Sequence, residues 1–171
     1  MVAPHELYDY LAKARGRLFD WIRPLSLEQY AREFPYGFKT IHATLAHTGS
    51  AEWAYARRLR GQPVAFGDSP LAAENVRSFA ELEAAWKPMA DDTRAILAGI
   101  TNWSDPVEYR MAPANAPASR IRTTRGGVAS QLLFHEIHHR SQVMSMLRQL
   151  GVAAQNLDYS ALIFDRQQEP V

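Results

Sequence analysis

The fold of this chain is constrained most by apolar residues that recur every three or four positions over long segments. The clearest run has the spacing 3, 4, 3, 4, 3, 4 and consists of Phe79, Leu82, Trp86, Met89, Thr93, Ile96 and Ile100. This spacing places the side chains on one face of an α-helix. Ser78 and Glu81 have the spacing of a capping box at its start, and Pro88 predicts a kink or an early break.

Three further segments have a helical pattern, at about residues 4–22, 40–60 and 125–150. The last two end at Gly61 and Gly151, and glycine commonly follows the last helical turn. Residues 24–39 form a connection with a short helical turn, and residues 61–77 form a long loop. We predict an all-α fold, an up-down four-helix bundle in a single domain over residues 1–171, with a long connection between helices.

Two smaller elements complete the predicted fold. Residues 107–110 and 121–123 could pair as a small hairpin before the last helix, across the Pro- and Ala-rich stretch 112–119. The final 20 residues are expected to dock onto the bundle through Leu157, Tyr159, Leu162, Ile163 and Phe164.

Composition excludes several classes of function. The 171 residues include no cysteine, so disulfides, cysteine-based zinc sites and a cysteine nucleophile are excluded. A formal charge of +1 offers no basic field for nucleic acid or an anionic membrane. The N-terminus lacks a signal-peptide pattern, and no apolar run is long enough to cross a bilayer. We therefore expect a cytoplasmic protein with no nucleic-acid or membrane partner.

Two histidines on the last predicted helix have the spacing of metal ligands. His135 and His139 are four residues apart, so both rings lie on one helix face and can reach one ion. The same face carries apolar residues: Val128, Leu132, Val143, Met146 and Leu150. The pair should therefore point into the core, where unpartnered imidazoles would cost free energy.

His47, on the second predicted long helix, is the best candidate for a third ligand. It lies on a stripe of small residues, which leaves room for a metal: Thr40, Ala43, Thr44, Ala51 and Ala54. Two alternatives remain open. The small residues could serve only close helix packing, and a buried histidine could simply be hydrogen-bonded in the core. His42 and His138 point to other faces and are poorer candidates.

Residues 135–139 also match the H-E-x-x-H signature of zinc proteases, with Glu136 as the general base. The extended signature requires Gly and His where this chain has Gln142 and Ser145. The downstream glutamate available as a ligand is Glu169, in the tail, and no large sheet is predicted that could hold an extended peptide. We therefore favour a different kind of metal site.

Several polar residues are candidates for supporting roles. Arg120, Arg122 and Arg125 precede the last helix and could bind an anionic cofactor, although a solvated hairpin face is the simpler interpretation.

Gln142 could orient a metal-bound water or hydrogen-bond within the bundle. Glu136 and Glu52 could hydrogen-bond to the ring nitrogens that do not bind the metal and so fix the histidine tautomers. Alternatively, they could lie exposed on their helices. Trp53 and Trp86 are expected in the core.

The combination of motifs resembles the DinB-like (DinB/YfiT) superfamily. Residues 135–142, His-Glu-Ile-His-His-Arg-Ser-Gln, followed by a leucine-rich turn that ends at Gly151, are similar to the family pattern H-x-x-x-H-R-G-Q. Ser141 stands where the family usually has glycine. The second helix also resembles the family, through Leu45-Ala46-His47, Glu52-Trp53 and the ending at residues 57–61.

The resemblance implies a four-helix bundle with a metal held by His47, His135 and His139. Related proteins bind nickel, zinc or iron, and they include bacillithiol S-transferases and a mycothiol-dependent maleylpyruvate isomerase. We therefore predict a divalent-metal-dependent enzyme that transfers a low-molecular-weight thiol to an electrophile. A metal-dependent hydrolase and a non-catalytic metal-binding stress-response protein are the alternatives.

A second apolar stripe on the last helix predicts a homodimer. Leu133, Ile137 and Met144 lie roughly 160–200° from His135 around the helix, away from the predicted core face. A second subunit could cover this stripe in a two-fold contact. The competing partner is the C-terminal tail of the same chain.

Overall fold

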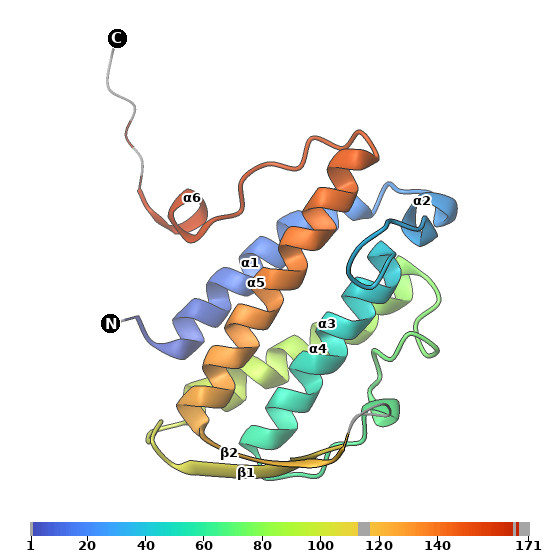
Figure 1. Ribbon diagram of the computed structural model, residues 1–171. Helices are drawn as coiled ribbons and strands as arrows, with labels where there is room; N and C mark the ends of the chain where they lie inside the picture. Colours follow the sequence, from blue (N-terminus) through green and yellow to red (C-terminus); the bar gives the residue numbers. More distant parts are fainter. Residues whose placement is uncertain (1, 113–116, 166, 168–171) are drawn as a thin grey trace.

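The computed structural model describes residues 2–112, 117–165 and 167. The chain is mostly helical and carries a small two-stranded sheet, as the sequence predicts (Figure 1). The long helices are α1 (Pro4–Ile22), α3 (Ile41–Leu59), α4 (Phe79–Gly99) and α5 (Arg125–Gln149). The shorter elements are α2 (Leu27–Ala31), the 3₁₀ helix η1 (Phe66–Asp68), β1 (Pro106–Met111), β2 (Ser119–Thr124) and α6 (Tyr159–Ile163).

Each long helix packs against two others. Helix α5 contacts α1 and α3, and α4 contacts the same two helices (Figure 1). The predicted apolar faces supply the core, and the largest fully buried side chains include Tyr8, Leu11, Ile41, Leu82, Trp86, Leu132 and Met146. No helix in the described part of the chain is long and apolar enough to cross a membrane.

The predicted helix boundaries agree closely with the structure. Ser78 accepts a hydrogen bond from the backbone N–H of Glu81 at the start of α4. Gly61 and Gly151 have positive φ values of 69° and 83° after α3 and α5, a conformation that glycine adopts without strain. The early break expected at Pro88 is wrong, because α4 continues through it. Trp86 and Met89 are buried on either side of the proline, so core packing holds the helix together.

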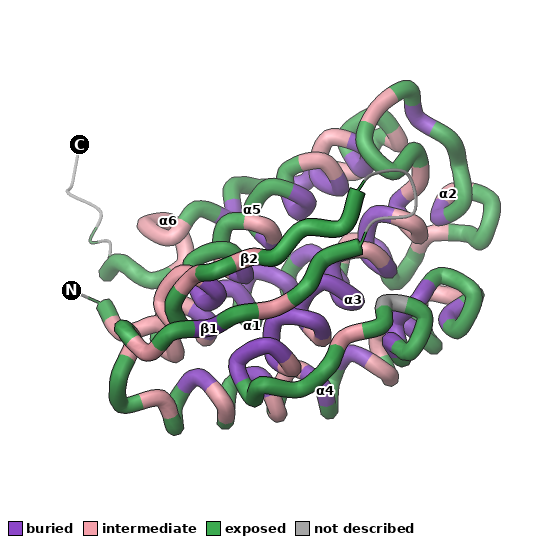
Figure 2. Tube along the Cα trace, turned by 60° about the horizontal axis from the view of Figure 1, so that its bottom comes forward, coloured by how far each residue is buried: buried purple, intermediate pink, exposed green. Residues whose placement is uncertain are grey.

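The predicted hairpin forms across one end of the helices. Val107 pairs with Thr123 and Arg110 with Arg120 in an antiparallel register. The strands contact α3 and α5, and Figure 2 shows them lying across the end of the helices. Residues 113–116 of the expected connection lie outside the described residues.

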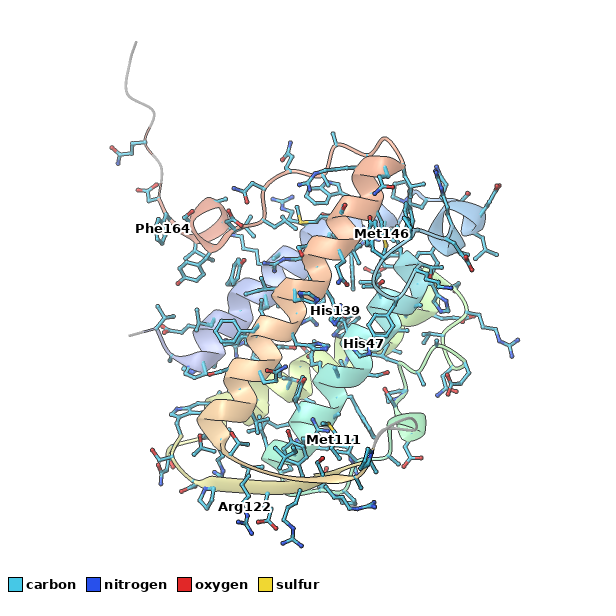
Figure 3. The ribbon with its side chains drawn as sticks, in the orientation of Figure 1. His47, Met111, Arg122, His139, Met146 and Phe164 are labelled. Carbon is cyan, nitrogen blue, oxygen red and sulfur yellow. The ribbon has the colours of Figure 1, made fainter. Side chains whose placement is uncertain are left out.

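The C-terminal segment packs on α1. The Tyr10 hydroxyl donates to the carbonyl oxygen of Leu157 at 2.9 Å, and the Lys13 ammonium donates to that of Leu162 at 2.7 Å. Leu157 is buried, as expected. Phe164 is instead 60% exposed and projects from the end of this segment (Figure 3).

A buried ionic network joins the four long helices. The Arg15 guanidinium of α1 donates to the Glu136 carboxylate of α5 at 2.8 and 3.1 Å, and it lies 3.1 Å from Glu52 of α3. Glu52 also accepts hydrogen bonds from the Tyr8 hydroxyl and, at 2.9 Å, from the Trp86 indole of α4. Arg15, Glu52 and Glu136 are each at most 6% exposed, so their charges depend on one another for compensation.

Replacement of Arg15 should therefore destabilise the fold strongly. Arg15→Met leaves two carboxylates buried without their cation, and we expect the free energy of unfolding to fall by about 3–5 kcal/mol. Urea unfolding followed by circular dichroism measures the change. The control is Arg23→Met, which breaks the exposed pair with Glu83 and should cost about 1 kcal/mol or less. Equal losses in the two variants would contradict the role of the network.

Candidate metal centre

Three histidines from two neighbouring helices converge at the middle of the molecule. His47 comes from α3, and His135 and His139 come from successive turns of α5. Figure 3 shows His47 and His139 on these two helices. One ring nitrogen from each lies within 4.8 Å of those of the other two. The Nε2 atoms of His47 and His135 are 3.1 Å apart. Residues 88 positions apart in the sequence therefore face each other across the α3–α5 contact.

This arrangement fits a divalent metal ion. Two nitrogen atoms bound to one ion at about 2.1 Å lie about 3.0–3.4 Å apart in octahedral or tetrahedral geometry. The separation of His47 and His135 falls within that interval. Facing ring nitrogens at this distance either share a proton or bind a common ion, and three imidazoles form a typical donor set for Zn, Ni or Fe.

Gln142 fixes the tautomer of His139. The Nδ1 atom of His139 lies 2.9 Å from the Gln142 Oε1 atom. An amide oxygen only accepts hydrogen bonds, so Nδ1 carries the proton and the lone pair resides on Nε2. The amide nitrogen of Gln142 in turn lies 3.1 Å from His138 Nε2 and donates to it. A partner that orients the far side of a ligand imidazole is a regular feature of metal sites.

Aromatic rings surround the histidines. Phe38 stacks on His47 with ring centroids 4.0 Å apart, and it lies 5.5 Å from the His139 ring. Positive φ values at Gly37 and Lys39, 57° and 66°, shape the turn that presents Phe38. Sequence analysis did not identify Phe38 as part of the site. Its signal was a turn rich in aromatic residues directly before the helix that carries His47.

Burial keeps the histidines neutral. It lowers the pKa of His47 from 6.5 to about 4 and that of His135 to about 3, and neighbouring imidazoles add to both shifts. Burial also lowers the pKa of His139, although its hydrogen bond to Gln142 opposes the shift. At neutral pH the rings therefore present lone pairs, as metal binding requires.

A cavity of about 1160 Å³ opens beside His47. It runs between α3, the loop after α3 and strand β1, and its lining includes Phe38, Ala43, Ala46, Pro63, Val64 and Met111. The small residues of α3 have two uses: Ala43 and Ala46 line the cavity, whereas Ala51 and Ala54 are buried in helix packing. A small molecule in this cavity would have access to the histidine cluster.

The three arginines of the hairpin region do not form the expected anion pocket. Arg120 and Arg122 both donate to Glu108, and their side chains are 69% and 76% exposed. Figure 3 shows Arg122 pointing away from the histidines. Arg125 pairs with Asp105 at 3.4 Å. These cations are compensated on a solvated surface, which is the simpler of the two interpretations.

Glu136 and Glu52 contact Arg15 instead of the histidines. The expected tautomer-fixing role is therefore wrong for them, because a buried arginine competes successfully for both carboxylates. The same contact leaves Glu136 unsuited to act as the base of a zinc protease. His42 lies 2.6 Å from the Val76 carbonyl oxygen, on a different side of α3, and Glu169 lies outside the described residues.

The lowered pKa values predict an acid-sensitive apoprotein. As the pH falls below 6.5, the unfolded chain binds protons at His47 and His135 before the folded chain does. The free energy of unfolding should therefore decrease between about pH 6.5 and pH 4. Urea unfolding in the presence of a chelator, over a pH series, measures this. His47→Gln should flatten the profile, and parallel profiles for wild type and His47→Gln would contradict the prediction.

Comparison with known proteins identifies the family of the chain. Residues 1–169 match the family model described as "DinB family". "Protein DinB" of Bacillus subtilis (strain 168) is 22% identical over 165 residues, which cover 93% of this chain and 92% of that protein. The family model spans nearly the whole chain, including both helices that carry the converging histidines. The chain therefore belongs to the DinB family.

Proposed function

We propose that this chain, an up-down four-helix bundle, is a divalent-metal-dependent enzyme whose ion is held by His47, His135 and His139. The observation that carries the proposal is the convergence of three imidazole nitrogens within 4.8 Å beside an open cavity. The tautomer set by Gln142 supports the same assignment. Nickel, zinc and iron are the candidate ions, because imidazole suits all three.

The reaction that fits this site best is transfer of a small thiol to an electrophile. A divalent ion held by the three neutral imidazoles would lower the pKa of a thiol or water that binds to it. The chain has no cysteine, so the thiol must come from a low-molecular-weight cosubstrate.

The surrounding residues position the reactants. Gln142 orients His139, and Phe38 covers one side of the His47 ring, which limits access of water there. The cavity receives the electrophile. Hydrolysis at the same site is the second candidate, and a non-catalytic metal-binding role in a stress response is the third.

Metal analysis tests the ligand set. Natively purified protein should contain about one divalent ion per chain, and His139→Ala or His47→Ala should lose it while largely retaining the helical circular dichroism signal. His42→Ala is the matched control, because His42 is also on α3 but contacts Val76. Full metal occupancy in His139→Ala would show that the ligands are assigned wrongly.

Turnover separates the candidate functions once the metal is known. A panel of low-molecular-weight thiols with small electrophiles should show metal-dependent consumption of the thiol, abolished in the two histidine variants. Metal-dependent ester hydrolysis without any thiol would favour the hydrolase. Absence of turnover in every assay, together with a filled coordination shell, would favour the non-catalytic role.

We also propose that the chain forms a homodimer through α5. On this helix Phe134 is 68% exposed and Ile137 is 39% exposed. Part of the expected apolar stripe is already covered, since Met144 is buried. The remaining apolar surface suits a second copy of the chain.

Light scattering at micromolar concentration should give twice the chain mass of 19.3 kDa. Ile137→Glu should shift the protein toward the monomer, since it places a charge in the contact. Leu27→Glu is the control, because Leu27 is 67% exposed on the separate helix α2. A wild-type mass near 19.3 kDa would refute the dimer.

A further inference from the structure

The face of α3 that carries His47 continues along the cavity to a buried arginine. His47, Ser50 and Arg58 all line the cavity. His47 and Arg58 are eleven residues apart, which is about three helical turns and a rise of roughly 16 Å. Figure 3 shows His47 and Met111, both lining residues, at different levels along α3. The cavity is thus elongated, with the histidine cluster toward one end.

Ser50 is a polar group that no described residue satisfies. Its side chain lies in the cavity wall and the residue is 8% exposed. Two other hydroxyls of α3 donate to the carbonyl one turn earlier: Thr44 to Thr40 and Thr48 to Thr44, both at 2.7 Å. Within the described chain, the Ser50 hydroxyl meets no hydrogen-bond partner. A buried hydroxyl that lines a cavity in this way is available to a ligand.

Arg58 supplies a fixed positive charge to the same cavity. The residue is 7% exposed, and its guanidinium carbon lies 4.1 Å from the centre of the Tyr109 ring and 5.4 Å from that of Tyr55. These rings hold the planar guanidinium between α3 and β1. Helical side chains lean toward the helix N-terminus, which directs Arg58 back toward Ser50 and His47. A planar guanidinium matches a carboxylate through two parallel hydrogen bonds.

The remaining lining limits the charge of the ligand. The charged residues of the described lining are Arg58, Arg110, Glu74 and Glu108, two of each sign. Glu108 is already paired with the arginines of β2. Much of the other lining is apolar, as at Phe38, Pro63, Val64 and Met111. A monoanion with an apolar body therefore suits the cavity better than a dianion.

We propose that the cavity binds a small-molecule carboxylate, with its anionic end at Arg58 and Ser50 and its apolar body extending toward His47. The identification of this ligand as the substrate rests on the proposed metal-dependent function. The binding of the carboxylate does not, because Arg58 lies about three helical turns from His47 along α3.

Calorimetry tests the proposal. The ligands are straight-chain carboxylates from butanoate to decanoate and the corresponding primary amides. Affinity should rise with chain length in both series, because the apolar lining buries each added methylene group. At each length the acid should bind about tenfold or more tightly than the amide, because only the acid places a charge at Arg58. Octanoate should also bind more tightly than octyl phosphate. An acid-to-amide ratio near one, or tighter binding of the phosphate, would overturn the proposal.

Three variants locate the binding site. Arg58→Met should remove the preference for the acid over the amide. Ser50→Ala should lower the affinity for octanoate severalfold. Arg60→Met, at the end of the same helix and paired with Asp92 on the surface, should bind as wild type does. If Arg58→Met does not fold, the Ser50→Ala variant tests the proposal instead. An unchanged affinity for octanoate in Ser50→Ala would overturn the proposal.

The metal-site variant separates this proposal from the proposed function. His139→Ala should retain the preference for the acid, since its carboxylate site is intact. A preference that disappears in His139→Ala but persists in Arg58→Met would show that the carboxylate binds at the metal, and would overturn the proposal. Retention of acid binding in a protein that holds no metal after native purification would contradict the metal-dependent function alone.

Discussion

The contact on which the rest of the structure depends is the buried Arg15 guanidinium between Glu52 and Glu136. With Tyr8 and Trp86, this network reaches all four long helices. Burial alone lowers the pKa of Arg15, but the two carboxylates outweigh it and keep the pKa above its ordinary value. Burial raises the pKa of Glu52, and Arg15 opposes that shift. Each charge is therefore tolerated only while its partners stay in place.

The network also sets the register of the two helices that carry the histidines. Glu136 follows His135 directly on α5, and Glu52 lies five residues after His47 on α3. A slide of α5 by one turn, about 5.4 Å, would separate Glu136 from Arg15 and His135 from His47 together. Apolar side chains would tolerate such a slide better, because hydrophobic contact has no preferred direction. The directional contacts of Arg15 thus favour the one register in which the three imidazoles meet.

The surroundings of the histidines and of Arg58 divide one elongated cavity into two chemical regions. Burial keeps the imidazoles neutral at one end, where Phe38 stacks on His47. Arg58 places a charge in the wall farther along α3, where Tyr109 of β1 contacts it. The hairpin is therefore part of the cavity as well as a cover for the end of the helices. Its outer face carries Arg120 and Arg122, whose charges are compensated by Glu108.

Local patterns in the sequence were sufficient to predict the helices, their caps and the hairpin. These patterns are apolar periodicity, the Ser78–Glu81 capping box and the glycines after α3 and α5. Each involves only a few neighbouring residues, so it can be recognised without knowledge of the tertiary structure. The pairing of His135 with His139 is local in the same sense, because one helical turn separates them. Family resemblance and a stripe of small residues then indicated His47, although neither gives a distance between helices.

Tertiary structure decided which of these residues meet. Periodicity gives the face on which a side chain lies, but not the residue opposite it. For this reason the sequence indicated Glu52 and Glu136 as partners of histidine, whereas packing of α1 brings Arg15 to them. The sequence did contain an indication of each arginine's role. Arg15 lies on the apolar face of α1 between Leu11 and Leu18, and Arg58 lies three turns from His47 on the same face of α3. The roles of the two arginines depend on contacts with other helices and with β1, and the sequence by itself does not specify these contacts.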